Sequence, residues 1–81
     1  MPRYFFDLYD GGAESRDEEG TELSDLNEAR REAIATVSEV AKERFPRGDD
    51  LNELTMGVRD DAGASLFEVA LTFSFKWSAK A

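Results

Sequence analysis

The side chains that could do chemistry in this chain are carboxylates, hydroxyls and arginines, because the sequence contains no histidine and no cysteine. It therefore lacks the commonest general base, the commonest transition-metal ligand and all thiolate chemistry. No motif that activates a serine nucleophile and no glycine-rich phosphate loop is present. Tyr4, Tyr9 and the carboxylates are left as acid–base groups, with no arrangement that predicts a pocket. We expect a protein that is not an enzyme and uses no cofactor.

Arg30 is the candidate residue for binding an anion. It lies in the middle of the apolar face of a predicted helix, between Leu26 and Ile34. In one interpretation its aliphatic stem packs on the core while the guanidinium reaches solvent or pairs with a carboxylate. In the other, the guanidinium holds the carboxylate or phosphate of a ligand through two hydrogen bonds. The packing interpretation is favoured, because arginines placed in this way are common.

A run of acidic residues near the N-terminus is the candidate metal site, since hard cations prefer carboxylate oxygens. Its spacing lacks the alternating oxygen ligands, the glycine and the late glutamate of a calcium loop. We therefore expect a solvated loop and no metal. The residues of this run are Asp10, Glu14, Asp17, Glu18, Glu19 and Glu22.

The helix that carries Arg30 is the best-defined element of the sequence. Either Ser24 or Asp25 can cap its start, and with Asp25 as the cap Glu28 completes a capping box. The helix continues to Phe45, where Pro46 stops it. Its apolar residues share one arc of about 160°. They are Ala29, Val40, Ala33, Leu26, Val37, Ala41, Ile34 and Phe45.

Two hairpins are predicted on either side of this helix. The aromatic-rich strand 3–9 is followed by a glycine turn and a polar return strand at 13–17, which suits an edge. After a polar connection over 47–53, strands at 54–58 and 65–77 flank a turn in which Gly63 is the bulge residue. The sequence thus predicts one α+β domain over residues 1–81, in the order β-β-α-β-β. Its four-stranded, mostly antiparallel sheet has one helix packed on one face.

The order of the strands in this sheet has two solutions. With the strands numbered along the chain, order 2-1-3-4 makes every neighbour antiparallel. Order 2-1-4-3 centres the two most apolar strands but makes them parallel. We favour the second order, because the sheet edges suit the polar strand 13–17 and the short strand 54–58.

The last strand is too long for the domain. Thirteen extended residues reach about 43 Å at 3.3 Å each, whereas a compact domain of this size is about 30 Å across. In addition, one helix about 10 Å wide cannot cover a sheet about 19 Å wide. Either the strand bends over its own core, or apolar residues stay exposed and contact a second copy of the chain. The predicted interface residues are Phe73, Phe75, Trp77, Phe5 and Tyr9.

The charge of the chain limits its partners. A formal net charge of -8 at pH 7 repels nucleic-acid phosphates and anionic membranes, so we expect neither as a partner. A basic protein remains compatible with it. The N-terminal residues lack the apolar region of a secretory signal, and no apolar run approaches the roughly 18 residues of a membrane span. We expect a cytoplasmic protein.

Three segments together resemble a known family. MPRYFFDLYDGG, RDEEGTELSDLNEARREAIATVSEVAKE and VRDDAGASLFEVALTFSF are similar to a family of short uncharacterised proteins of rhizobia and other alphaproteobacteria. The resemblance implies the ββαββ fold and a bacterial cytoplasmic setting, and it implies no activity. The fold is also similar to that of HicB antitoxins, which bind a basic toxin ribonuclease, although this chain lacks their appended DNA-binding segment.

Three functional hypotheses follow from these observations, and the least favoured, because the usual catalytic groups are absent, is a small enzyme or ligand carrier with Arg30 or Tyr9 in a pocket at a dimer seam. In the first, the protein is a non-enzymatic interaction module that self-associates, as a dimer, through its β-sheet. In the second, it is an acidic inhibitor that binds a basic protein, either like an antitoxin or as a mimic of nucleic acid.

Overall fold

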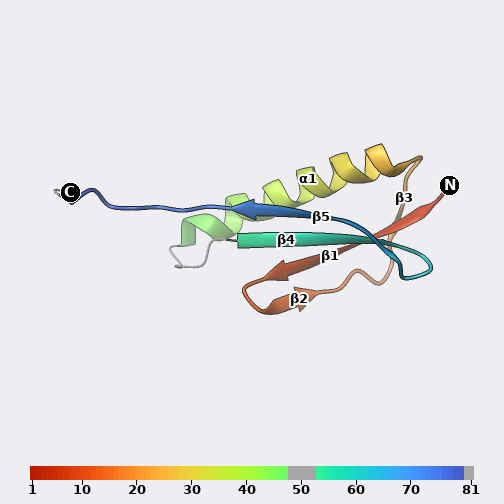
Figure 1. The fold of residues 1–81 in the computed structure, drawn as a ribbon, viewed down its shortest axis with the longest axis horizontal. Coiled ribbons are helices and arrows are strands. Elements are labelled where there is room, and N and C mark those ends of the chain that lie inside the picture. The colour runs from red at the N-terminus through yellow and green to blue at the C-terminus, as the bar shows by residue number, and fades with distance from the viewer. Residues whose placement is uncertain (48–52, 80–81) are drawn as a thin grey trace.

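The computed structural model shows an α-helix packed on one face of an antiparallel sheet (Figure 1). The structure describes residues 1–47 and 53–79. The polar connection predicted over residues 47–53 falls mainly outside the described residues. The architecture confirms the predicted α+β class, with one short additional strand.

The N-terminal strand holds two short strands on one of its edges. β1 (Arg3–Asp10) pairs near its end with β2 (Ala13–Ser15) and near its start with β3 (Thr21–Glu22), both antiparallel. The return strand predicted over residues 13–17 therefore ends two residues early. The chain turns between β2 and β3, and the sequence did not predict β3.

The central strand of the sheet is not the one that we favoured. β4 (Glu53–Asp60) lies between β1 and β5 (Ser65–Thr72), so the order is β2-β1-β4-β5 and every pair is antiparallel. The favoured order 2-1-4-3 is wrong. That order assumed that the strand directly after the helix is short, but this strand, β4, has eight residues, as many as β5. The hairpin turn, with Gly63 at a φ of +87° as the bulge residue, also keeps β5 beside β4.

The helix begins after Asp25, one of the two caps that the sequence predicts. α1 (Leu26–Arg44) has Asp25 as its N-cap, whose carboxylate accepts a hydrogen bond from the Glu28 N–H at 2.9 Å. The Glu28 carboxylate in turn accepts hydrogen bonds from the N–H and hydroxyl of Ser24. The last turn passes into a 3-10 helix, η1 (Phe45–Arg47), which contains Pro46. Within the described residues, no helix has the length and apolarity needed to cross a membrane.

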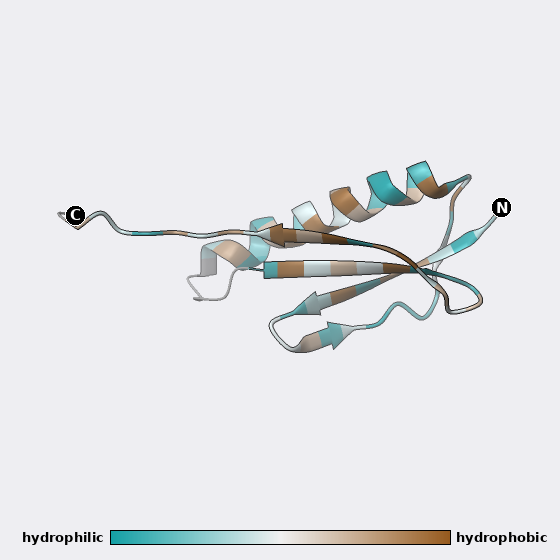
Figure 2. Cartoon of the chain, viewed as in Figure 1, coloured by the Kyte–Doolittle hydropathy of each residue, from teal (hydrophilic) through white to brown (hydrophobic). Residues whose placement is uncertain are grey.

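The core lies between one small-residue face of α1 and the sheet. The helix buries four residues spaced at four-residue intervals, and their small side chains let it approach the strands closely. Figure 2 shows the hydrophobic colouring concentrated on β5 and the adjoining strands, with hydrophilic residues along the connection from β2 to β3. The buried apolar residues are Ala29, Ala33, Val37 and Ala41 on the helix, and Tyr4, Leu54, Met56 and Val58 on the sheet.

The predicted overhang is present at the C-terminus. β5 ends at Thr72 because this residue faces Glu53, the first residue of β4. The chain then continues past the end of the sheet, so that the last described residues lie at the opposite end of the molecule from the N-terminus (Figure 1). The extents of 55 × 22 × 17 Å and the radius of gyration of 14.8 Å exceed the value of about 12 Å for a compact chain. The strand predicted over residues 65–77 therefore ends at Thr72, and the residues after it project beyond the sheet instead of bending over the core.

Candidate functional site

Residues 73–77, here called the C-terminal aromatic segment, carry the most exposed rings of the molecule. Phe73, Phe75 and Trp77 are 41%, 64% and 76% exposed. Phe73 stacks on Phe45 with ring centroids 5.2 Å apart, so the end of the helix covers one side of it. The rings of Phe75 and Trp77 meet edge to face at 5.0 Å, and both remain mostly exposed. The predicted exposure of these three rings is thus confirmed, while their role in an interface stays a prediction.

The outer edge of β5 continues into this segment. In the described part of the chain β5 pairs with β4 alone, so its other edge presents unpaired backbone N–H and C=O groups. Such an edge can accept another strand, and natural proteins commonly protect it with a charge, a proline or a bulge. Here a bulge interrupts the start of β5, where Val58 faces Phe67 but Arg59 faces Ser65. From Phe67 onward the edge is regular.

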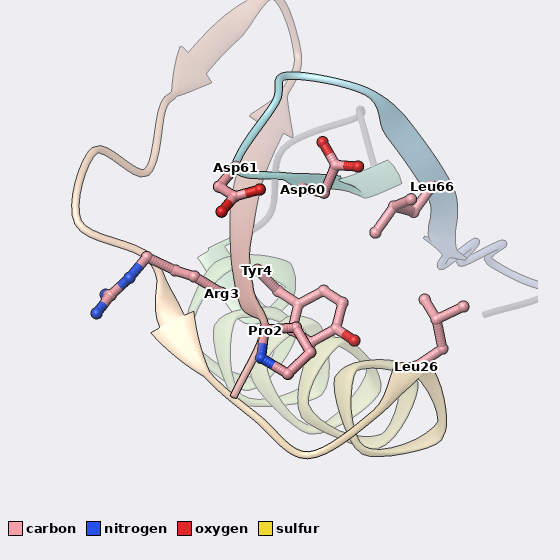
Figure 3. Close-up of a pocket in the computed structure, with 7 residues that line it drawn as sticks. All are labelled: Pro2, Arg3, Tyr4, Leu26, Asp60, Asp61 and Leu66. Carbon is pink, nitrogen blue, oxygen red and sulfur yellow. The ribbon is translucent and has the colours of Figure 1, made fainter.

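A second group of exposed apolar residues begins at the N-terminal end of α1 and extends along the helix to its middle. Leu26 and Ile34 of α1 are 52% and 41% exposed, and Leu66 is 36% exposed. Figure 3 shows Leu26 and Leu66 on the same side of a hollow, beside the ring of Tyr4. The hollow has a volume of about 320 Å³. Strict alternation would place Leu66 and Ala70 on the open face of the sheet, the face away from the helix. The bulge adds Leu66 as an extra residue of β5 and shifts the alternation, so Leu66 lies on the helix side.

Phe5 and Tyr9, the other two predicted interface residues, lie on the open face of β1, away from the helix. The guanidinium of Arg59 lies over the Phe5 ring, 4.7 Å from its centroid, and Phe5 is half-buried. Tyr9 is 39% exposed. Phe73 extends the opposite, helix-facing row of β5, because it stacks on Phe45. The structure therefore does not bring Phe5 and Tyr9 together with the C-terminal aromatic segment.

Arg30 is exposed on the helix, between the exposed Leu26 and Ile34. This position agrees with the interpretation in which the stem lies on apolar surface and the guanidinium is in water. Its role toward a ligand stays a prediction.

The open face contains a buried ion pair that the sequence interpretation missed. The Asp7 carboxylate is 4% exposed and accepts a hydrogen bond from the Arg59 Nε at 2.8 Å. The Arg59 Nη2 also donates to the backbone carbonyl of Asp17 at 2.7 Å. The backbone N–H of Asp17 returns a hydrogen bond to Asp7 at 2.9 Å. These contacts join β1, β4 and the turn before β3.

The Asp17 side chain organises that turn. One carboxylate oxygen accepts the N–H of Phe6 at 3.0 Å, and the other accepts the N–H groups of Glu19 and Gly20. Gly20 adopts a φ of +73°, and a Cβ atom there would lie 2.8 Å from the Phe5 ring. The turn thus requires glycine for both its backbone conformation and its contact with Phe5.

The hydrogen bonds of this network decide its protonation. Burial alone raises the pKa of the Asp7 carboxyl, but the hydrogen bonds from Arg59 and Asp17 and the nearby positive charges outweigh it and lower the pKa. Burial likewise raises the pKa of Asp17, and its three backbone N–H donors reverse the shift. Both groups are therefore charged near neutral pH. Burial and the charges of Glu14 and Asp7 raise the pKa of Tyr9, which stays neutral.

This network has the properties of a structural element. The carboxylate and guanidinium satisfy each other, and among the described residues no buried side-chain nitrogen or oxygen lacks a partner. Two signals in the sequence could have revealed it. Asp7 interrupts an aromatic strand, and Arg59 is the only basic residue between 53 and 72.

The acidic run does not gather into a metal site. Among residues 1–47 and 53–79, no group of three or more histidine, cysteine, aspartate or glutamate side chains lies close enough to hold an ion. The carboxylate of Asp17 is occupied by backbone N–H groups.

These features define a small α+β protein in which an antiparallel sheet with one covered face extends into an exposed aromatic segment. The chain belongs to the family described as a domain of unknown function, DUF6894, which matches residues 3–72. This confirms the predicted membership of an uncharacterised family. The match includes α1 and all the strands and stops before the C-terminal aromatic segment. No curated protein and no solved structure matches the chain significantly.

Proposed function

We infer that the protein is a cytoplasmic, non-enzymatic interaction module that self-associates through its β-sheet. The observation that carries this proposal is the exposure of Phe73, Phe75 and Trp77 beside the unpaired edge of β5. Exposed aromatic rings are unfavourable in water, and a free strand edge is a template on which another strand can pair, so both are commonly covered by a partner. A second copy is the simplest partner, because two-fold homodimers are the commonest oligomers.

The size of the exposed surface supports a dimer. At about 200 Å² per aromatic side chain, the exposed fractions of these rings leave about 360 Å² in each chain. If each copy buries this area against an equal area of its partner, the total is about 1,400 Å². This value lies within the range of about 1,200–2,000 Å² for specific interfaces.

Sedimentation equilibrium from about 1 to about 100 µM tests the proposal. The mass should rise with concentration from the 9.1 kDa of the monomer toward twice that value. Trp77, the only tryptophan, supplies a second readout, because its emission should shift to the blue as the dimer forms. Phe75→Ser should keep the chain monomeric while retaining this fluorophore. Tyr9→Ser, on the opposite face, is the matched control and should leave the dimer intact. A mass of 9.1 kDa at every concentration refutes the proposal.

The alternative function is an acidic inhibitor that binds a basic protein, as the similarity to HicB antitoxins of bacteria implies. The observation in its favour is the net charge of -8, with Glu14, Glu18, Glu19 and Glu22 all exposed along the β2–β3 side. A pull-down from an alphaproteobacterial lysate at low salt tests it. Recovery of no basic protein would rule it out, whereas a basic partner lost at high salt would support it.

A further inference from the structure

The exposed strand edge has a self-complementary sequence. From Phe67 to Trp77 the chain reads FEVALTFSFKW, and its residue types are symmetric about Thr72. Apolar residues lie one, three and five positions to either side of Thr72. Small residues lie two positions away on each side, and charges of opposite sign, Glu68 and Lys76, lie four positions away on each side. A strand with this symmetry can pair with an antiparallel copy of itself so that every side chain meets a matching one.

We propose that two copies of the chain pair along β5 and the C-terminal aromatic segment, antiparallel, with the two-fold axis at Thr72. This proposal rests on the proposed function and specifies its interface. Directly opposite residues of antiparallel strands lie on the same face of the sheet. In this register Glu68 therefore lies opposite the partner's Lys76, and the small residues face one another. On the helix side, Phe67 faces the partner's Trp77.

In this register the C-terminal aromatic segment of one copy lies beside the exposed apolar residues Leu26, Ile34 and Leu66 of the other. α1 and β5 run in the same direction, with Leu26 near Leu66 at one end and Phe45 near Phe73 at the other (Figure 1). Ile34 is about 12 Å along the helix from Leu26, at 1.5 Å per residue. Val69 is about 10 Å along β5 from Leu66, at 3.3 Å per residue. Ile34 and Val69 therefore lie at nearly the same level.

The partner's aromatic residues lie opposite successive positions along β5 and therefore beside successive exposed residues of α1. The partner's Phe75 lies opposite Val69, beside the exposed Ile34. The partner's Trp77 lies opposite Phe67, next to Leu66 and Leu26. One contact, repeated by the two-fold axis, thus covers both the aromatic segment and the exposed flank of the helix. These are the apolar groups that the single chain leaves open.

The two helices do not collide in this arrangement. The axis passes through Thr72, next to Phe73, which stacks on Phe45 just after the C-terminal end of α1. The helices of the two copies therefore lie end to end over one continuous antiparallel sheet. An axis near the middle of β5 would instead place them side by side and leave Phe75 and Trp77 without an apolar partner.

Cysteine cross-linking tests the register, because the chain has no native cysteine. On oxidation, Thr72→Cys should form a disulfide-linked dimer, since antiparallel partners directly opposite one another have Cα atoms about 4.5–5.5 Å apart. Ala70→Cys and Ser74→Cys are the matched controls. Neither should link to itself, because its copy is about 13 Å away along the strand. A mixture of the two should form the mixed dimer.

Charge reversal tests the same register without oxidation. Glu68→Lys and Lys76→Glu should each weaken dimerisation by about fivefold or more, because like charges then lie opposite one another at two symmetric positions. The combined variant should return to within about twofold of the native dissociation constant. Glu14→Lys on β2 makes the same change in charge as Glu68→Lys and should not weaken the dimer.

The outcomes separate this proposal from the proposed function. A native dimer that cross-links through Ala70→Cys alone, or in which Thr72→Cys remains unlinked, overturns the register and leaves self-association standing. Failure of the combined charge variant to recover has the same meaning. A native chain that stays monomeric overturns both. Efficient linking at Thr72→Cys together with charge rescue establishes the register.

Discussion

Gly20→Ala should destabilise the fold through two separate effects. The φ of +73° at Gly20 costs a residue with a side chain about 1–2 kcal/mol. The new Cβ would lie 2.8 Å from the Phe5 ring and 2.9 Å from the Arg3 Cγ. Overpacking of this kind costs about 1–3 kcal/mol, and the ring cannot easily retreat because Arg59 covers it. We therefore expect a loss of about 2–5 kcal/mol in the free energy of unfolding.

This loss is large for a chain of this size. A domain of 81 residues has a total stability of about 4–12 kcal/mol. The thermal midpoint should therefore fall by about 8–40 °C. Urea and thermal unfolding followed by circular dichroism measure both quantities.

Two other substitutions separate the backbone effect from the steric one. Gly63 has a similar φ of +87°, but a Cβ atom added there would meet no atom within 4 Å. Gly63→Ala should therefore lose only the backbone contribution of about 1–2 kcal/mol. Gly20→Asn keeps the steric contact but tolerates positive φ better, so it should be less damaging than Gly20→Ala. Equal losses for Gly20→Ala and Gly63→Ala would refute the inference that Phe5 is held against the turn.

Three further predictions concern the contacts of the single chain. The pKa values of Asp7 and Asp17 in the folded protein lie below the unfolded value of 3.8. The stabilisation that these two charged carboxylates provide is therefore complete above about pH 3.8 and is lost as the pH falls through the lowered pKa values. Acid unfolding should accordingly become less steep in Asp7→Asn, and an unchanged profile would contradict the shift. Asp25→Ala removes the N-cap and should lower the free energy of unfolding by about 1 kcal/mol, measured in urea. Arg59→Met should lower the thermal midpoint, because it leaves the buried Asp7 charge unpaired. Adding Asp7→Leu to Arg59→Met removes that charge and should restore part of the loss. A double variant less stable than Arg59→Met alone would contradict this reasoning.

The sequence predicted best those features that depend on neighbouring residues. The capping of α1 by Asp25 and the conformation of Gly63 follow from residues within four positions along the chain. The alternation of apolar residues likewise predicted the strand that became β4. Its residues Leu54, Met56 and Val58 are almost completely buried. The length of the last strand, compared with the size of a compact domain, predicted that the chain either bends or overhangs there, and the exposure of Phe75 and Trp77 shows which of the two occurs.

Features that join distant parts of the chain were decided only by the tertiary structure. Asp7 and Arg59 are 52 positions apart, and no local spacing indicates that β1 and β4 bring them together. The strand order was likewise not indicated by local spacing, because it depends on how far β4 extends beside β1 and β5. The bulge beside Arg59 moved Leu66 to the helix side, which alternation alone could not foresee. Local conformation is determined by adjacent residues, whereas the pairing of strands is determined by which packing buries the most apolar surface across the whole domain.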